Sequence, residues 1–493
     1  MQARVVLLPL LLAGAIGAAE ARPWLEPDDL RARHSVQWLA DRGCFNAPVS
    51  TWPLMWADLS PGLDAAATLP ECRDSAAWRY LAFERDYQRN HTIQASVTLG
   101  GASDEPVFRG FSAAPREEAE ASVRLEMSSG RLAMGLTGTW TNDPRDGDSG
   151  RVDGSYLAGT AGNWVLGAGA IDRWWGPGWR SSTILSDNAR PAPGVWINRR
   201  ASTPSGWRPA SWLGPWNFTA FAGQLERERY VPRTKLIGMR FSFKPWRYME
   251  VGLSRTVQWG GSGRPQGFSS FWEAMIGRDN GQRGPDGDPG NQLGGADVRF
   301  GFPVGSTVLG VYGQVTGEDE AGGLPSTYMG LAGIDLGTQL WQGEQRLFVE
   351  YTDTTAGAWS HERRPNVGYE HSIYRTGYRF NGRNIASTWE SDAQVLSVGV
   401  SHFFSGGQEV SVGYDRAKLN RDGTQRPRPA SAGIPMLDPI GRQDVDIYSL
   451  QYRQPLLRGR LTLSAYYTDK EIRSALDDYS RGTVMALWEF RFD

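Results

Sequence analysis

The chain of 493 residues has few lysines, few cysteines and almost no charge imbalance. Only four of its 52 basic residues are lysines, and the formal net charge is −2. A strongly basic surface for nucleic acid is therefore absent, and so is the acidic stretch typical of a disordered tail. Beyond the N-terminus, no run approaches 18 consecutive apolar residues, which excludes a helical membrane protein.

Glycine and tryptophan are abundant instead. The chain has 60 Gly and 21 Trp, and this glycine content is roughly twice the average. Arginine supplies most of the positive charge, and it is the donor suited to paired contacts with carboxylates and other planar or polyoxygenated groups. A chain rich in Gly, Trp, Tyr and Arg but poor in long apolar runs is typical of a β-rich fold.

Residues 1–21 have the pattern of a secretory signal peptide. Arg4 is followed by an apolar stretch from Val5 to Ala19, and Ala19-Glu20-Ala21 matches an Ala-x-Ala cleavage site. The alternative, an uncleaved membrane anchor, needs about 20 apolar residues and no cleavage site. We therefore expect export of the chain.

Cys44 and Cys72 are the only cysteines. In an oxidising periplasm we expect them to form a disulfide, worth ~3 kcal/mol in the chain-entropy account. Two lone cysteines do not make a metal site, and we expect neither a metal nor a cofactor.

Residues 22–91 carry helical signals. Asp28 and Asp29 can cap a first helix. Ser60 and Pro61 should be the N-cap and the first helical residue of a second helix, and Asp74 should begin a third. Gly43 ends the first helix. The element is too small to be stable alone, so it should pack on something larger.

From Thr92 onward, apolar and polar residues alternate with a period of two. Val123, Leu125 and Met127 are one example. Segments of about ten residues can cross a bilayer when tilted, and tight turns alternate with long polar loops, as in outer-membrane barrels. The connection at 202–214 is long for the periplasmic side of the barrel, where tight turns are expected. Eighteen strands are predicted, beginning near residues 92, 119, 131, 151, 163, 194, 215, 234, 247, 295, 306, 326, 345, 394, 408, 444, 459 and 481.

The predicted fold is therefore all-β. Residues 92–493 should form an 18-stranded antiparallel transmembrane outer-membrane β-barrel with long extracellular loops. Residues 22–91 should form a small N-terminal periplasmic α-helical element. The last strand, which ends in alternating aromatics, suits recognition by the barrel assembly machinery.

No group of residues suggests catalysis. The chain has no Gly-x-Ser-x-Gly, and its five histidines form no pair at i, i+4. The sequence Gly147-Asp148-Ser149-Gly150 has ordinary turn composition. An enzyme such as a lipase or deacetylase would need a triad or a metal site, so we predict that the protein is not an enzyme.

Most of the tryptophans are assigned to the aromatic girdles at the two membrane interfaces. One cluster is different, because the turn Gly176-Pro177-Gly178 holds three indoles beside guanidinium groups. Indole faces stack on sugars and Arg pairs with hydroxyls or carboxylates, but the loop could equally fold into the lumen and pack there. The candidates for polysaccharide binding or lumen plugging are Arg173, Trp174, Trp175, Trp179, Arg180 and Arg190.

Charges of both signs occupy the positions expected to face the lumen. They are Arg124, Arg240, Arg299, Arg346, Arg460 and Arg491 against Glu120, Glu126, Glu250, Asp297, Glu350 and Glu409. A balanced interior can pair with itself, which favours a filled barrel over a wide pore.

Three stretches of the chain resemble the Wzi family of capsule-assembly proteins of the Gram-negative outer membrane. The first runs from Trp24 to Arg31 and continues in Leu39–Gly43 and Thr51–Leu54. The second is Trp174–Ser182 with Ile184–Pro191, and the third is Gly377–Arg383. The cysteines are not part of this resemblance.

The resemblance implies an eighteen-stranded barrel with a periplasmic helical bundle, acting as a lectin that helps to anchor capsular polysaccharide or exopolysaccharide. The expected partners are that polysaccharide and outer-membrane lipid, and we expect a monomer. A sugar-specific porin or transporter is the alternative, because eighteen strands and aromatic residues near a lumen also suit a path for sugars.

Overall fold

The computed structural model describes residues 22–492 except 112–114, 277–289, 322–323, 359–361, 425–436 and 475–477. The predicted signal peptide, residues 1–21, lies outside this part of the chain. Within it, no helix is long and apolar enough to cross a membrane.

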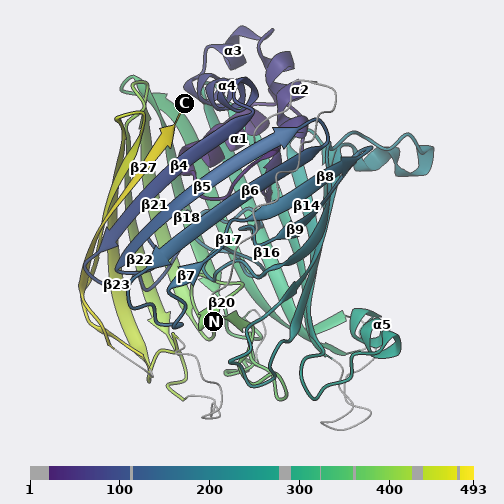
Figure 1. Ribbon diagram of the computed structural model, residues 1–493, viewed down its shortest axis with the longest axis vertical. Coiled ribbons are helices and arrows are strands. Elements are labelled where there is room, and N and C mark those ends of the chain that lie inside the picture. Colours follow the sequence, from purple (N-terminus) through teal and green to yellow (C-terminus); the bar gives the residue numbers. More distant parts are fainter. Residues whose placement is uncertain are drawn as a thin grey trace, which may run out of the picture.

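The wall is a closed antiparallel barrel (Figure 1). Each wall strand pairs with the next one along the chain, and the last strand pairs with the first. Two short strands, β7 and β8, both pair with β6 and occupy one position in the wall. The described residues thus form eighteen wall positions, as predicted.

The wall strands are β4 (Ile93–Ala102), β5 (Ala119–Ser129), β6 (Leu132–Thr141), β7 (Gly150–Arg151), β8 (Tyr156–Ala161), β9 (Trp164–Gly169), β11 (Gly194–Arg199), β12 (Trp216–Gln224), β13 (Lys235–Trp246), β14 (Met249–Trp259), β15 (Gly290–Val304), β16 (Thr307–Ala321), β17 (Leu324–Leu340), β18 (Gly343–Asp353), β21 (Gln394–Phe404), β22 (Glu409–Leu419), β23 (Gln443–Leu456), β24 (Gly459–Thr468) and β27 (Gly482–Phe492). Their starts lie within two residues of the predicted ones, with two exceptions: β15 begins five residues earlier, and β8, which shares a position with β7, begins five residues after the predicted start at 151.

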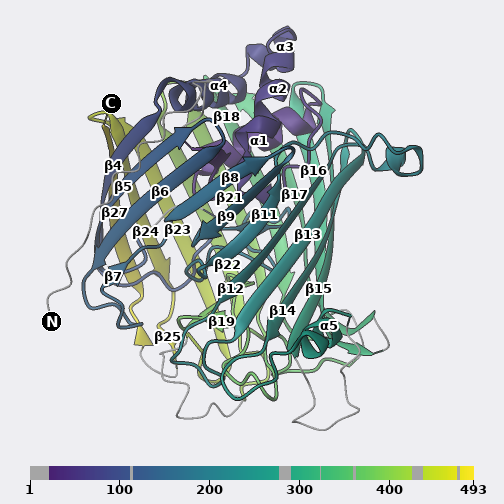
Figure 2. The same cartoon turned by 45° about the vertical axis from the view of Figure 1, so that its right-hand side comes forward.

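The two ends of the barrel differ. At one end, which we call the short-turn end, most connections are tight turns, and the N-terminal helices and the C-terminus lie there (Figures 1 and 2). At the opposite, long-loop end, the chain makes long connections such as 170–193 and 354–393. The connection 200–215 is the long one at the short-turn end, as the sequence indicated.

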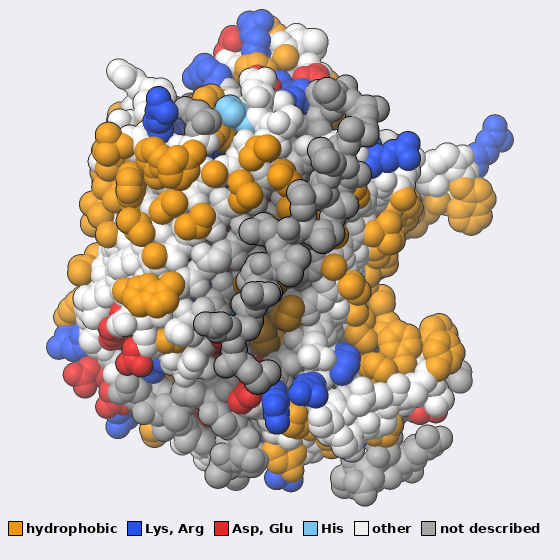
Figure 3. All heavy atoms as spheres, viewed as in Figure 1, with side chains coloured by type: hydrophobic (Ala, Val, Ile, Leu, Met, Phe, Trp, Pro, Cys, Tyr) orange, Lys and Arg blue, Asp and Glu red, His pale blue; other side chains and the backbone are white. Residues whose placement is uncertain are grey.

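Side chains alternate between the lumen and the outer surface. In β14, Glu250 is 4% exposed and points inward, whereas Leu253 is 49% exposed on the outer face. Figure 3 shows hydrophobic patches on the outer wall, with charged side chains gathered toward the two ends. This is the distribution of a barrel surrounded by lipid.

The N-terminal element contains four helices: α1 (Leu30–Asp41), α2 (Trp56–Ala66), α3 (Pro70–Arg73) and α4 (Ala76–Asn90). Asp29 caps α1 as predicted, because its side chain accepts a hydrogen bond from the Ala32 amide at 3.0 Å. Two short strands, β1 (Trp24–Leu25) and β3 (Leu54–Met55), pair antiparallel beside them.

Two predicted helix starts are wrong. Helix α2 begins at Trp56, and Pro61 lies inside it rather than at its first turn. The fully buried Trp56 and Leu59 extend the apolar face toward the N-terminus, and this burial outweighs the local preference of Pro for position N1. Helix α4 is capped by Ser75, whose hydroxyl accepts from the Trp78 amide at 3.1 Å, while Asp74 pairs with Arg73 at 3.0 Å.

Cys44 and Cys72 are joined in the structure, with their Cα atoms 5.9 Å apart. Both are buried beside Phe45 and Leu63 in the core of the helical element. The bond links the end of α1 to α3, across a separation of 28 residues, and so closes the helices into one unit.

The disulfide of the exported protein remains a prediction. Alkylation of the purified protein before and after reduction, read by mass spectrometry, should label both cysteines only after reduction. Cys44→Ser should make residues 22–91 more sensitive to protease, because the chain-entropy contribution of about 3 kcal/mol is lost. Two thiols that label freely without reductant would contradict the prediction.

Candidate functional site

The predicted Trp cluster lies inside the barrel. Trp174 and Trp175 are fully buried and Trp179 is 4% exposed. The first two form the short strand β10, which pairs antiparallel with β2 (Thr51–Trp52) of the N-terminal segment. A loop that starts at the long-loop end thus meets a segment from the short-turn end within the lumen. We use "plug" for the lumenal parts of the described residues within 22–55, 170–193 and 354–393.

Arg33 of α1 lies where these segments meet. Its guanidinium is stacked at 4.3 Å from the ring centre of Phe111, 5.2 Å from Trp174 and 4.6 Å from Trp179. It donates hydrogen bonds to three successive backbone carbonyls, those of Pro177, Gly178 and Trp179. Burial lowers the pKa of Arg33 to about 10, so the group is still charged at neutral pH. Arg33 therefore ties helix α1 to two loops of the far end.

Two carboxylates of the wall hold the backbone of the plug. Glu350 of β18 accepts from the amides of Trp179 at 2.6 Å and Ser181 at 2.9 Å. Glu250 of β14 accepts from the amides of Val49 and Ser50, both at 2.9 Å. A carboxyl oxygen can accept more than one hydrogen bond, so each of these side chains pairs with two backbone amides. The wall thereby supplies acceptors for plug amides that have left water.

The 354–393 loop completes the plug. The Tyr369 amide donates to Glu318 of β16 at 2.8 Å, and the Tyr369 hydroxyl donates to the Thr183 carbonyl at 2.9 Å. Within the loop, Arg379 is fully buried between Glu370 at 2.8 Å and Glu390 at 2.7 Å. The loop contains the hairpin β19 (Arg379–Phe380) and β20 (Arg383–Asn384).

The other predicted residues also contact protein groups. Arg180 pairs with Asp415 at 2.9 Å, and Arg190 pairs with Asp146 and Asp153, each at 2.7 Å. Arg173 is 9% exposed, and its guanidinium lies 4.7 Å from the Phe221 ring centre. The structure thus places all six candidates in or beside the plug. A role of these residues in sugar binding remains a prediction.

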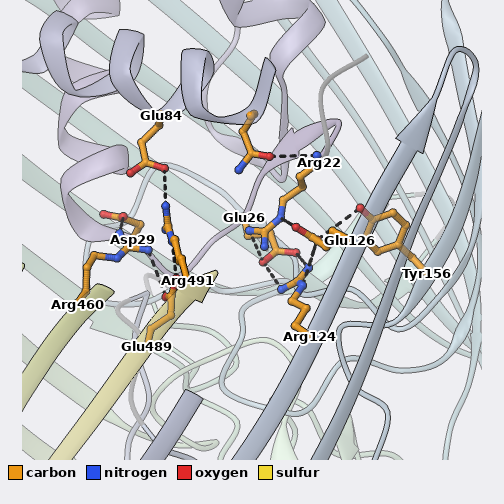
Figure 4. A network of polar contacts seen from close by, with 11 residues as sticks. Arg22, Glu26, Asp29, Glu84, Arg124, Glu126, Tyr156, Arg460, Glu489 and Arg491 are labelled. Carbon is orange, nitrogen blue, oxygen red and sulfur yellow. Dashed lines mark hydrogen bonds and ion pairs between the residues drawn. The ribbon is translucent and has the colours of Figure 1, made fainter. Parts of the chain in front are cut away.

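The helical element is attached to the wall by two ion-pair groups (Figure 4). In one, Arg22 pairs with Glu126 of β5 at 2.8 Å, and Arg124 of the same strand pairs with Glu26. In the other, Arg491 of β27 lies 3.3 Å from Glu84 of α4, and Arg460 pairs with Asp29. The mixed charges predicted for the lumen thus pair across the boundary between helices and wall.

The assignment of most tryptophans to the girdles does not extend to those inside the barrel. Among the described residues, nine tryptophans are buried: Trp24, Trp38, Trp52, Trp56, Trp174, Trp175, Trp179, Trp196 and Trp389. They fill the interior between the segments of the plug and the helices. Among those assigned to the girdle, Trp140, Trp246 and Trp341 are more than half exposed at strand ends, which fits that assignment.

Sequence reasoning missed Arg33, Phe111 and Tyr369. Arg33 looks like any charged residue of an amphipathic helix, and its partners lie about 145 residues away. Glu250 and Glu350 were placed correctly in the lumen by the period of two, but nothing local showed that they bind backbone amides. In the described part of the chain, no group of three or more His, Cys, Asp or Glu could hold a metal ion.

Comparison with known proteins agrees with this architecture. The family model described as capsule assembly protein Wzi matches residues 88–481. The chain belongs to the Wzi family.

A Klebsiella pneumoniae protein, named an uncharacterized 55.8 kDa protein in the cps region, is 34% identical over 357 residues, which are 71% of this chain and 69% of the relative. The Escherichia coli Wzi structure has 26% identity and a TM-score of 0.80, and the match covers 95% of this chain and 99% of that one. That protein is described as an outer-membrane, carbohydrate-binding β-barrel involved in group 1 capsule assembly.

The three stretches that resemble the Wzi family meet in the plug. Thr51 and Trp52 of the first pair with Trp175 and Trp174 of the second. Tyr378 of the third donates to the Ile184 carbonyl of the second at 3.3 Å. In this member of the family, the signature residues are therefore the residues that fill the lumen.

Replacement of Arg33 should loosen the plug. Arg33→Gln removes the stacked cation and leaves buried carbonyls without donors, at about 1–3 kcal/mol for each unsatisfied group. We expect the variant to fold and to show frequent current steps in a planar bilayer, where we expect the unaltered protein to be silent.

Arg79→Gln is the matched control, because Arg79 is an exposed residue of α4 that donates to the Asp74 carbonyl of the same helical element at 3.0 Å. It should stay silent. An Arg33→Gln protein that is folded, by heat-modifiable gel mobility, and equally silent would contradict the role of Arg33.

Plug opening should also depend on pH through Asp187. Burial raises the pKa of this carboxyl to about 8, with Asp172 adding to the shift and Arg109 and Arg116 opposing it. In an open plug the exposed carboxyl would titrate near its ordinary value of about 4. The open state therefore binds fewer protons than the closed one, so opening should become easier as pH rises from about 4 to about 8 and level off above.

Current steps counted at pH 5 and pH 8 test this dependence. Asp187→Asn should remove most of the increase between the two values, because the amide does not ionise. An equal increase in both proteins would show that Asp187 is not the titrating group.

Proposed function

We propose that this protein is an outer-membrane lectin that binds exported capsular polysaccharide or exopolysaccharide and helps to hold and assemble it at the cell surface. The observation that carries the proposal is the plug, in which the family-signature residues occupy the lumen. A filled lumen leaves the surface of the loops, rather than a path through the barrel, as the place where a long polymer can bind.

The proposed orientation places the long-loop end outside the cell. Residues 1–21 would direct export and be removed, and residues 22–91 would lie in the periplasm with the C-terminus. The last strand, which carries Trp488, Phe490 and Phe492, would be read by the barrel assembly machinery. The partners would be the polysaccharide and outer-membrane lipid, and the protein would act as a monomer without catalysis.

The buried Trp cluster cannot stack on a sugar while the plug is closed. An accessible aromatic site lies at the long-loop end, where Tyr230 is 36% exposed and the Arg375 guanidinium lies 5.1 Å from its ring centre. The Tyr230 amide donates to Thr376 Oγ1 at 2.9 Å, which fixes the 225–234 loop to the 354–393 loop. An exposed ring beside an Arg can stack on a sugar face and bond its hydroxyls or carboxylates.

Tyr230→Ala should weaken binding of the strain's own polysaccharide to the purified protein. We expect a loss of about five- to tenfold, since stacking of a base on an aromatic is worth about 1–3 kcal/mol, a sugar falls at the low end of that range, and about 1.4 kcal/mol is a factor of ten. Tyr248→Ala is the control, because Tyr248 also lies against an arginine, Arg247 at 5.1 Å, but at the short-turn end. Equal affinity of both variants would place the sugar elsewhere on the loop surface.

Deletion of the gene should leave polysaccharide synthesis and export intact. We expect the same total polysaccharide, shifted from cell-bound to shed material, because retention and not production is lost. Loss of total polysaccharide would instead favour a role in export, as the porin alternative requires.

A further inference from the structure

Two arms leave the barrel sideways on the same side of the molecule, one near each end (Figures 1 and 2). The turn arm is the connection 200–215 between β11 and β12, and it contains the 3-10 helix η1 (Arg208–Leu213). The loop arm is helix α5 (Phe268–Ile276). Neither arm takes part in the plug. The turn arm is the long connection at the short-turn end, where the other connections are mostly tight turns.

The turn arm exposes large aromatic side chains and is held firmly. Trp207 is 69% exposed and Trp212 is 62% exposed, and the exposed Arg208 lies between them in the sequence. The Ser202 amide and hydroxyl donate to Asp58 of α2 at 2.8 and 2.7 Å. The arm is therefore a fixed projection that presents indoles beside a cation.

The loop arm also exposes aromatics. One side of α5 packs on the wall, where Phe271 meets Trp259 edge-on at 5.5 Å and Ala274 is 1% exposed. Phe268 and Trp272, one helical turn apart, are 81% and 55% exposed. Figure 3 shows hydrophobic side chains on both projections at the right of the molecule, with a hollow between them.

The spacing of the arms matches the apolar layer of an outer membrane. Trp212 packs edge-on against Phe243 of β13 at 5.7 Å, and α5 packs beside Trp259, which pairs with Lys235 at the other end of β13. The eight residue steps from Lys235 to Phe243 span about 26 Å along the strand, or about 20 Å of height at the usual tilt. The apolar band of such barrels is about 25 Å tall.

We propose that the two arms are interfacial anchors that bind the lipid bilayer, one in each leaflet. Exposed aromatic rings, which both arms carry, are typical of the headgroup level of a membrane, and in the turn arm Arg208 can in addition contact the phosphates. The arms continue the lipid-facing surface of the wall, so lipid and not a protein partner is the occupant. The choice of leaflet for each arm rests on the orientation proposed above, but contact with lipid does not.

Such anchors would fix the height and tilt of the barrel in the membrane. A protein that holds a long polymer is pulled away from the cell, and two aromatic projections at the borders of the apolar layer resist displacement in either direction. This role explains why the connection 200–215 is long, because a tight turn could not extend beyond the wall into the lipid.

Spin labels test the contact directly in vesicles of phosphatidylethanolamine and phosphatidylglycerol. Since Cys44 and Cys72 are bonded to each other in the structure, one introduced cysteine takes the label. Labels at Trp207→Cys and Phe268→Cys should be several-fold more accessible to oxygen, relative to a water-soluble nickel complex, than a label at Arg73→Cys. A label at Leu253→Cys, on the outer wall, gives the value for the apolar layer.

Arm labels that match the aqueous Arg73→Cys value would overturn the proposal, whichever way the barrel is inserted. A second measurement separates lipid contact from packing within the protein. The double variant Phe268→Ser/Trp272→Ser should lower the unfolding temperature in these vesicles and leave it unchanged in detergent micelles. An equal loss in both, or no loss in vesicles, would contradict the role of α5 as a lipid anchor.

Discussion

The fold depends on the need to give every buried amide of the plug an acceptor. An eight-stranded barrel is filled by its own side chains, but one of eighteen strands encloses a space that side chains alone cannot fill. Here the space is filled by chain segments, and their backbone groups leave water to enter it. An unpaired buried amide costs about 1–3 kcal/mol, and Glu250, Glu318 and Glu350 of the wall remove that cost by accepting from plug amides.

The same constraint explains why segments from both ends meet. The helices alone reach only part of the lumen, and the 170–193 loop enters from the other end until β10 pairs with β2. Arg33 then bonds the turn that follows β10 and stacks on its indoles. A buried cation of this kind is costly unless hydrogen-bond acceptors and aromatic faces surround it. The contact therefore specifies one arrangement of the plug. The chain segments that occupy the lumen are what separate this account from that of a porin.

Much of the wall was predictable, and much of the plug was not. The strand starts followed from a period of two, which is a local property of the sequence and is reinforced at every strand. The site residues were found only as a cluster of Trp and Arg, with stacking on sugar and packing in the lumen equally open. Which of these the cluster does depends on Arg33, Phe111 and Glu350, residues remote in sequence, and no local pattern links them. The predicted start of α2 was wrong for a related reason, because burial of Trp56 outweighed the local signal at Pro61.

Hydrogen exchange of the purified protein in a lipid bilayer tests the central claim most directly. If wall carboxylates hold the plug, the amides of Val49, Ser50, Trp179 and Ser181 should exchange as slowly as those of the wall strands, although they lie outside any wall strand. Glu350→Gln should speed exchange at Trp179 and Ser181 and leave Val49 and Ser50 protected. Amides of the plug that exchange as fast as those of the exposed residues 422–424 would show that the lumen is open and would contradict the account.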